Sequence, residues 1–149
     1  MDIRNWLYYM AIGNSPAIMD KNIGQGSQYL WTYRDADGNY LDGAKNYRLH
    51  IPPNIPAKAF WSVVVYDTLS RSQLQNGQPF PAVSSYTKPL VNADGSIDIY
   101  LGPQEPKEKG NWIRTVPGKG WFPFFRFYGP TEPYFDQTWK LEDIVAVRQ

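Results

Sequence analysis

Between residues 47 and 67 the chain reads Tyr47-Arg-Leu-His-Ile-Pro-Pro-Asn-Ile-Pro-Ala-Lys-Ala-Phe-Trp-Ser-Val-Val-Val-Tyr-Asp67. Every second residue from Tyr47 to Ile51 is apolar, which predicts a strand with one buried face. Pro52 and Pro53 end that strand, because proline has no backbone N–H to donate to a sheet. The run from Phe60 to Tyr66 is apolar on both faces, which predicts a central strand that is covered on both sides.

A second aromatic stretch reads Trp112-Ile-Arg-Thr-Val-Pro-Gly-Lys-Gly-Trp-Phe-Pro-Phe-Phe-Arg-Phe-Tyr-Gly-Pro130. It predicts two strands, 112–116 and 121–128, joined as a hairpin whose glycines permit positive φ. Further strands are expected at 28–33 and 97–101, tight turns at 35–39 and 92–96, and a last strand or docking segment within 138–147. Residues 69–86 are expected to form a long irregular loop, and such loops are often functional.

About seven short strands without alternating helices predict a mainly β fold, an antiparallel two-sheet β-sandwich spanning residues 26–149. The first 25 residues differ from this pattern. Ile3, Trp6, Leu7 and Met10 follow helical spacing, so residues 1–25 are expected to form a short helical segment that packs on the sandwich or extends from it.

The composition narrows the classes of function. A chain of 149 residues with a net charge of +1 is one domain and has no electrostatic field suited to nucleic acid. The sequence contains no cysteine, which excludes disulfides and thiolate metal sites. No stretch approaches the roughly 18 apolar residues of a membrane span. The N-terminus does not read as a signal peptide, and the compartment is left open. No cofactor or metal is predicted.

Catalytic signals are weak. His50 is the sole histidine of the chain, and no Gly-x-Ser-x-Gly motif accompanies it, so a polar surface role is the simpler interpretation. The acid-rich turn at 35–42 is similar in part to a calcium loop but lacks the closing glutamate, and turn chemistry explains the same residues. Carboxylate pairs for glycoside hydrolysis have four candidates, for which capping or solvation is the favoured role: Asp67, Asp98, Glu132 and Asp136.

The aromatic content, 16% of the chain, is the best hint of a ligand. Aromatic faces stack on sugar rings, bases and cations. Most of these side chains are nevertheless expected in the core of the sandwich. Four of them lie next to predicted turns, where a position on the rim is expected: Trp112, Trp121, Tyr128 and Tyr134.

Four motifs in order give the chain a family resemblance. They are the stretch 47–67, Asp94-Gly-Ser-x-Asp-Ile-Tyr-x-Gly-Pro103, Asn111-Trp-Ile-x-Thr-Val-Pro-Gly-Lys-Gly-Trp-Phe122 and Arg126-x-Tyr-Gly-Pro-x-Glu-Pro-x-Phe-Asp-x-Thr-Trp139. The chain resembles the domain-of-unknown-function 1214 family from residue 26 onward. The resemblance implies a jelly-roll-like β-sandwich, often the C-terminal domain of a larger, frequently exported bacterial protein. It supplies no catalytic residues.

Three functions follow from these observations. The first is a binding module for a carbohydrate or another small polar ligand. The second is a structural or interaction domain that packs against a partner domain or forms a homo-oligomer, and the third is a hydrolase that uses His50 or a carboxylate pair. The candidate ligand-binding residues are His50, Tyr66, Asp67, Arg71, Gln73, Trp112, Lys119 and Arg126.

Overall fold

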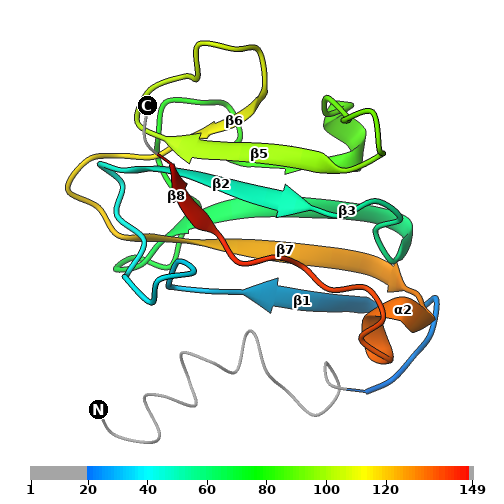
Figure 1. Cartoon of the computed structure of the whole chain (residues 1–149). Helices are drawn as coiled ribbons and strands as arrows, with labels where there is room; N and C mark the ends of the chain where they lie inside the picture. Colours follow the sequence, from blue (N-terminus) through cyan, green and yellow to red (C-terminus); the bar gives the residue numbers. More distant parts are fainter. Residues whose placement is uncertain (1–19, 148–149) are drawn as a thin grey trace, which may run out of the picture.

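The computed structural model describes residues 20–147 and is mainly β (Figure 1). Its elements are β1 (Ser27–Trp31), β2 (Asn46–Ile51), β3 (Ala57–Asp67), β4 (Ala82–Ser84), the 3-10 turn η1 (Ser85–Thr87), β5 (Ile97–Gly102), β6 (Asn111–Arg114), β7 (Trp121–Pro130), the one-turn helix α2 (Glu132–Phe135) and β8 (Val145–Val147). The helix predicted within residues 1–25 falls largely outside the described residues, so it stays a prediction, as does a domain boundary at residue 25.

Within residues 20–147, eight strands form two four-stranded sheets. The first sheet has the order β1-β7-β3-β4, and the second has the order β6-β5-β2-β8. All pairs in the first sheet are antiparallel, and β3 and β7 share the longest register, from Ala57 opposite Pro130 to Asp67 opposite Trp121. These two long strands form the centre of the first sheet.

The core lies between the two sheets, as the alternation of side chains predicts. Tyr47, Leu49 and Ile51 of β2 are buried, in agreement with the expected buried face. They belong to one cluster with inward-facing residues of β3 and β7, including Val63 and Phe125. The ring of Tyr47 meets that of Trp121 edge-on at 5.5 Å, so an aromatic contact joins the two sheets. The mainly β, sandwich-like prediction is confirmed at this level.

Three expectations about the topology are wrong. The predicted strands 112–116 and 121–128 are not a hairpin, because β6 lies in the second sheet and β7 in the first. β6 instead pairs with β5 in parallel, so the sandwich is not wholly antiparallel. The stretch 69–86 is not all loop, since it contains β4 and η1. The jelly-roll topology implied by the resemblance stays a prediction.

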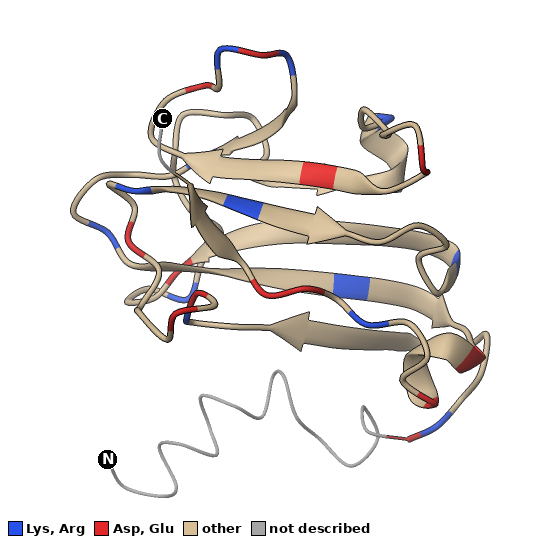
Figure 2. Ribbon diagram, in the orientation of Figure 1, with Lys and Arg blue, Asp and Glu red and all other residues tan. Residues whose placement is uncertain are grey.

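The charged residues lie mostly in turns and loops, while the strands are largely uncharged (Figure 2). No helix within residues 20–147 is both long and apolar enough to cross a membrane.

The turn chemistry expected at 35–39 is confirmed, because the Asp35 carboxylate accepts the N–H groups of Asp37 at 3.1 Å and Asn39 at 2.8 Å. Within the described part of the chain, no group of three or more His, Asp or Glu side chains is arranged to hold a metal ion.

Candidate functional site

Most of the aromatic rings of the first sheet that are not in the core stand on its outer surface. In β7, Phe125 and Phe127 face the core, so Phe124, Arg126 and Tyr128 face outward. Strands β1 and β3 add rings to the same side. We call this surface the aromatic–arginine face and define it by Tyr29, Trp31, Tyr33, Phe60, Tyr66, Phe122, Phe124, Arg126 and Tyr128.

The rings of this face stack against one another. Trp31 lies against Phe124 with centroids 5.4 Å apart and planes 3° from parallel. Phe60 is sandwiched between Tyr128, at 4.2 Å, and Tyr86, at 5.0 Å. Trp31 belongs to the edge strand β1, and Tyr86 is 75% exposed. The second stack therefore ends on an exposed ring, that of Tyr86, while the first ends on Trp31, which is only partly buried.

β3 is covered on its outward side as well, by aromatic side chains of its own sheet. Ser62 and Val64, on the outward side of β3, are only 7% and 8% exposed. The rings of neighbouring residues flank them on this surface, among them Phe124, which lies opposite Val64 in the register. The aromatic side chains thus act as the cover that a third layer of structure would otherwise supply.

Arg126 occupies the middle of the face. Its Nη2 donates a hydrogen bond to the Tyr66 hydroxyl at 2.7 Å. The guanidinium lies 4.6 Å from the Phe124 ring centroid and 5.4 Å from that of Tyr66, within the range of a cation–π contact. Among residues 20–147, no carboxylate lies within 4.0 Å of this guanidinium.

Arg71 lies at the other end of the same row of rings. Its guanidinium is 5.3 Å from the Tyr33 ring and 5.4 Å from the Phe122 ring, and it donates a hydrogen bond to the Tyr33 hydroxyl. The backbone of Arg71 has φ of 61°, a left-handed conformation that non-glycine residues seldom adopt. Such conformations cost about 1–3 kcal/mol and are frequent at binding sites.

A hollow of about 360 Å³ adjoins this end of the face, and its wall contains Tyr33, which belongs to the face, and Arg71 beside it. The other residues of its wall are Tyr40, Leu41, Thr68, Gly120 and Trp121. Trp121 is fully buried, so its expected position on the rim is wrong. Its indole N–H has no hydrogen-bond partner within the described residues. An unsatisfied buried donor in a hollow wall is unusual, since most such groups are paired.

Asp67 and Lys119 form an ion pair at the end of β3, with Nζ 2.9 Å from Oδ2. The hydrogen bond from Lys119 and the N–H groups of Ser70 and Leu69 lower the pKa of Asp67, although burial opposes them. These contacts fix the start of the loop that carries Arg71, whose N–H donates to the Asp67 carbonyl at 3.0 Å. Asp67 therefore supports the site from inside the molecule rather than lining it.

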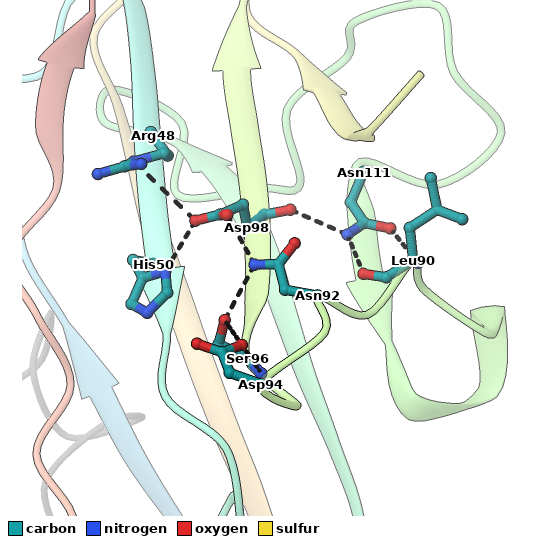
Figure 3. Close-up of polar contacts among 8 residues, drawn as sticks. All are labelled: Arg48, His50, Leu90, Asn92, Asp94, Ser96, Asp98 and Asn111. Atoms are coloured by element: carbon teal, nitrogen blue, oxygen red, sulfur yellow. Dashed lines mark hydrogen bonds and ion pairs between the residues drawn. The ribbon is translucent and has the colours of Figure 1, made fainter. Parts of the chain in front are cut away.

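Two predicted site residues lie on the second sheet instead. His50 Nδ1 is 2.8 Å from Asp98 Oδ1, and Asn92 donates to the other Asp98 oxygen at 2.8 Å (Figure 3). Burial disfavours the charged form of Asp98, but the hydrogen bonds from His50 and Asn92 outweigh it and lower its pKa. Arg48 Nε is 3.9 Å from Asp98 Oδ1.

The described residues place no side-chain nucleophile against His50. The hydroxyl nearest to it in the network belongs to Ser96, which donates to Asp94 at 2.6 Å and accepts from Asn92 at 2.9 Å (Figure 3). No serine or threonine hydroxyl within the described chain bonds to His50. A nucleophile and its base need such a contact. The arrangement ties the turn at 92–96 to β2 and β5.

Trp112 is the other predicted site residue on the second sheet, and its side chain also binds a backbone group. Its indole N–H donates to the Gly102 carbonyl at 3.1 Å, and it lines a separate pocket of about 310 Å³ beside the loop 104–109. The structure thus brings Tyr66, Arg71 and Arg126 together and places Gln73 beside them through a backbone bridge to Tyr66. It does not bring His50 or Trp112 to that face.

Several residues of the face were not predicted as site residues, above all Trp31 and Phe124. The signal was present in β7, where aromatic residues occupy both inward and outward positions from Trp121 to Tyr128. A strand of a two-sheet sandwich needs apolar side chains on one side only. The surplus on the other side marks a surface that differs from ordinary solvent-exposed sheet.

The chain belongs to the DUF1214 family, described as a protein family of unknown function, whose pattern it matches over residues 26–132. The family assignment based on the four sequence motifs is therefore confirmed. No curated protein of known function matches the sequence.

Two solved structures are similar to this one. The VPA0106 protein from Vibrio parahaemolyticus is 23% identical with a TM-score of 0.69, over 94% of this chain and 33% of that one. A putative uncharacterized protein from Burkholderia cenocepacia is 16% identical with a TM-score of 0.62, over 92% of this chain and 31% of that one. These likenesses show the fold. The chain spans about a third of the length of each protein.

Proposed function

We propose that this domain is a binding module for a polar ligand that contains rings, a carbohydrate before others, and that the aromatic–arginine face is its binding surface. The observation that carries the proposal is the outward row of stacked rings around Arg126, on the side of the sheet where a sandwich needs no apolar residues. Aromatic residues supply rigid contact area to a ligand at little cost in conformational entropy.

The ends of the two stacks suit a sugar ring. A pyranose presents an apolar C–H face that packs on an aromatic face, and Trp31 and Tyr86 each have one face engaged by a neighbour. The hydroxyls of Tyr66 and Tyr33 and the two guanidiniums provide polar partners along the same row. Ligand sites commonly combine apolar contact with a few fixed polar groups in this way.

A titration calorimetry and thermal-shift panel of neutral and charged oligosaccharides tests the proposal. Binding to at least one class is expected, with the affinity lowered about fivefold or more in Trp31→Ala or Tyr86→Ala, since a stacked ring contributes about 1–3 kcal/mol. Tyr100→Ala is the matched control, because Tyr100 lies on the second sheet. A panel in which no saccharide binds, or binding that Tyr100→Ala weakens equally, contradicts the proposal.

A second candidate, docking on a partner chain or self-association, has one observation in its favour. Large apolar side chains are exposed at Leu69 (91%), Phe80 (76%) and Val91 (58%). Exposed apolar side chains that cluster into a patch mark interaction surfaces. Sedimentation velocity over a range of concentrations tests self-association. It predicts a dimer that Phe80→Ser disrupts, whereas a monomeric binding module shows no dimer.

A further inference from the structure

The surroundings of Arg126 differ from those of several other basic side chains. Lys21 and Lys119 each form an ion pair at 2.8 Å and 2.9 Å, and Arg48 lies 3.9 Å from an aspartate. Arg126, in the middle of β7, contacts the rings of Phe124 and Tyr66, donates to the neutral Tyr66 hydroxyl and lies opposite Ser62 in the register. A guanidinium carries five N–H donors, and the Tyr66 hydroxyl accepts one of them.

The hydroxyl of Tyr66 is oriented by the same contact. Because it accepts from Arg126, its own proton remains available to a ligand, and no other hydrogen bond of this hydroxyl is formed within residues 20–147. Arg126 and Tyr66 thus present neighbouring donors at one point of a surface made mostly of aromatic rings. Donors of this kind, and no acceptor, suit an oxyanion.

A second cation continues the pattern along the row. Arg71 contacts Phe122 at 5.4 Å, Phe122 stacks on Tyr66 with centroids 5.6 Å apart, and Tyr66 contacts Arg126. The order along the face is therefore guanidinium, ring, ring, guanidinium. A polysaccharide that carries carboxylates presents both kinds of group, apolar ring faces and anions.

We propose that the ligand of this face is an acidic polysaccharide whose uronate carboxylate binds Arg126 and the Tyr66 hydroxyl, while its sugar rings pack on the aromatic side chains. The inference depends on the proposed function and adds the charge of the substrate class to it. A carboxylate accepts two parallel N–H bonds from one guanidinium, which fixes the orientation of the sugar ring that carries it.

Titration calorimetry with two forms of one oligosaccharide tests the inference: oligogalacturonate, and the same oligomer fully methyl-esterified. The ester keeps the rings and removes the charge. The acid is expected to bind at least about tenfold more tightly, because hydrogen bonds to a charged group contribute about 1.5–3 kcal/mol. Equal affinity for both forms overturns the inference and leaves the binding module intact, whereas absence of binding to any saccharide contradicts the binding module itself.

Variants locate the contact. Arg126→Gln is expected to reduce binding of the acid to the level of the ester and to leave the affinity for the ester unchanged. Arg114→Gln is the matched control, because Arg114 also lies over a ring, 5.1 Å from that of Trp112, but on β6. Arg126→Lys keeps the charge and removes the paired donors, so its affinity for the acid is expected to be intermediate. This variant provides the test if Arg126→Gln does not fold. The assignment is contradicted if Arg114→Gln loses affinity for the acid, or if neither Arg126 variant does.

Discussion

The side-chain amide of Gln78 completes the free edge of β6, since its Oε1 accepts the Arg114 N–H at 2.9 Å and its Nε2 donates to the Trp112 carbonyl at 3.4 Å. Asn76 adds a bond of 2.7 Å to the Arg114 carbonyl. The loop before β4 therefore uses two side chains where another strand would use its backbone. Unpaired strand edges are liabilities that proteins cover, and this edge is covered without a ninth strand.

The first prediction concerns this edge. Gln78→Ala is expected to lower the free energy of unfolding by about 1–2 kcal/mol, because it leaves backbone groups of β6 without partners. Gln75→Ala is the control, since Gln75 is exposed and bonds only to the Gln73 carbonyl of its own loop. Urea unfolding of both variants checks the difference. Equal stability of the two would show that water replaces the Gln78 amide at no cost.

A second prediction separates the Tyr66 hydroxyl from the stability of the fold. Tyr66→Phe is expected to change the free energy of unfolding by less than about 0.5 kcal/mol, since Arg126 is only partly buried and water can solvate it. Binding of an acidic oligosaccharide is expected to weaken about tenfold or more, because a hydrogen bond to a charged group contributes about 1.5–3 kcal/mol. Calorimetry and thermal melting on the same sample check both quantities. Unchanged affinity would remove Tyr66 from the binding surface.

The third prediction is a pH dependence. The pKa of Asp67 is lowered in the folded protein, so this carboxylate stabilises the fold fully above its unfolded pKa of about 4. That contribution is lost as the pH falls through the lower folded value. Asp67→Asn is therefore expected to be less stable than the native chain at neutral pH, by about 1–2 kcal/mol.

The two proteins are expected to converge in stability as the pH falls below about 4. Asp37→Asn is the control, because Asp37 is exposed and its side chain takes part in no ion pair among the described residues. Guanidinium unfolding at a series of pH values measures the difference. A gap between Asp67→Asn and the native chain that stays constant with pH would rule out the charge as its cause.

The fourth prediction contrasts two glycines. A methyl group at Gly43 would collide with the backbone oxygens of Val116 and Lys119, while Gly38 has φ of 82° and open space around it. Gly43→Ala is expected to cost more than about 3 kcal/mol or to prevent folding, because backbone cannot move aside cheaply. Gly38→Ala is expected to cost about 1–2 kcal/mol from the left-handed backbone alone. Thermal melting ranks the two, and the reverse order would contradict the packing of the loop at 42–44 against that at 116–119.

Local patterns predicted the strands well and the connections between them poorly. The alternation from Tyr47 to Ile51 gives β2 and its buried face, because burial acts on each side chain separately. The turn at 117–120 contains the glycine that a hairpin needs, with φ of 79° at Gly118, yet the chain crosses there from one sheet to the other. Turn residues determine local backbone geometry, whereas the choice of a sheet depends on distant partners, which no local pattern contains.

The candidate site was predicted only in part, because it too depends on which distant strands pair. Tyr66 and Arg126 lie 60 residues apart and meet because β3 and β7 pair with Ser62 opposite Arg126. Both were predicted as ligand-binding residues because each is a polar residue within an aromatic stretch. Trp31 and Phe124 were expected in the core with most other rings, since an apolar residue gives no local sign of the side of the sheet that it occupies. That side follows from register, and register follows from pairing.

Arg126 also has a consequence for solubility. It is the single charged residue of β7, in the middle of a broad surface of rings on a pleated sheet. Surfaces of this kind stack on copies of themselves, and an embedded charge opposes that stacking because it would be buried without a counter-ion. The residue that would select an anionic ligand would thus also keep the empty surface from aggregating, and the two effects cannot be separated by any substitution that removes the charge.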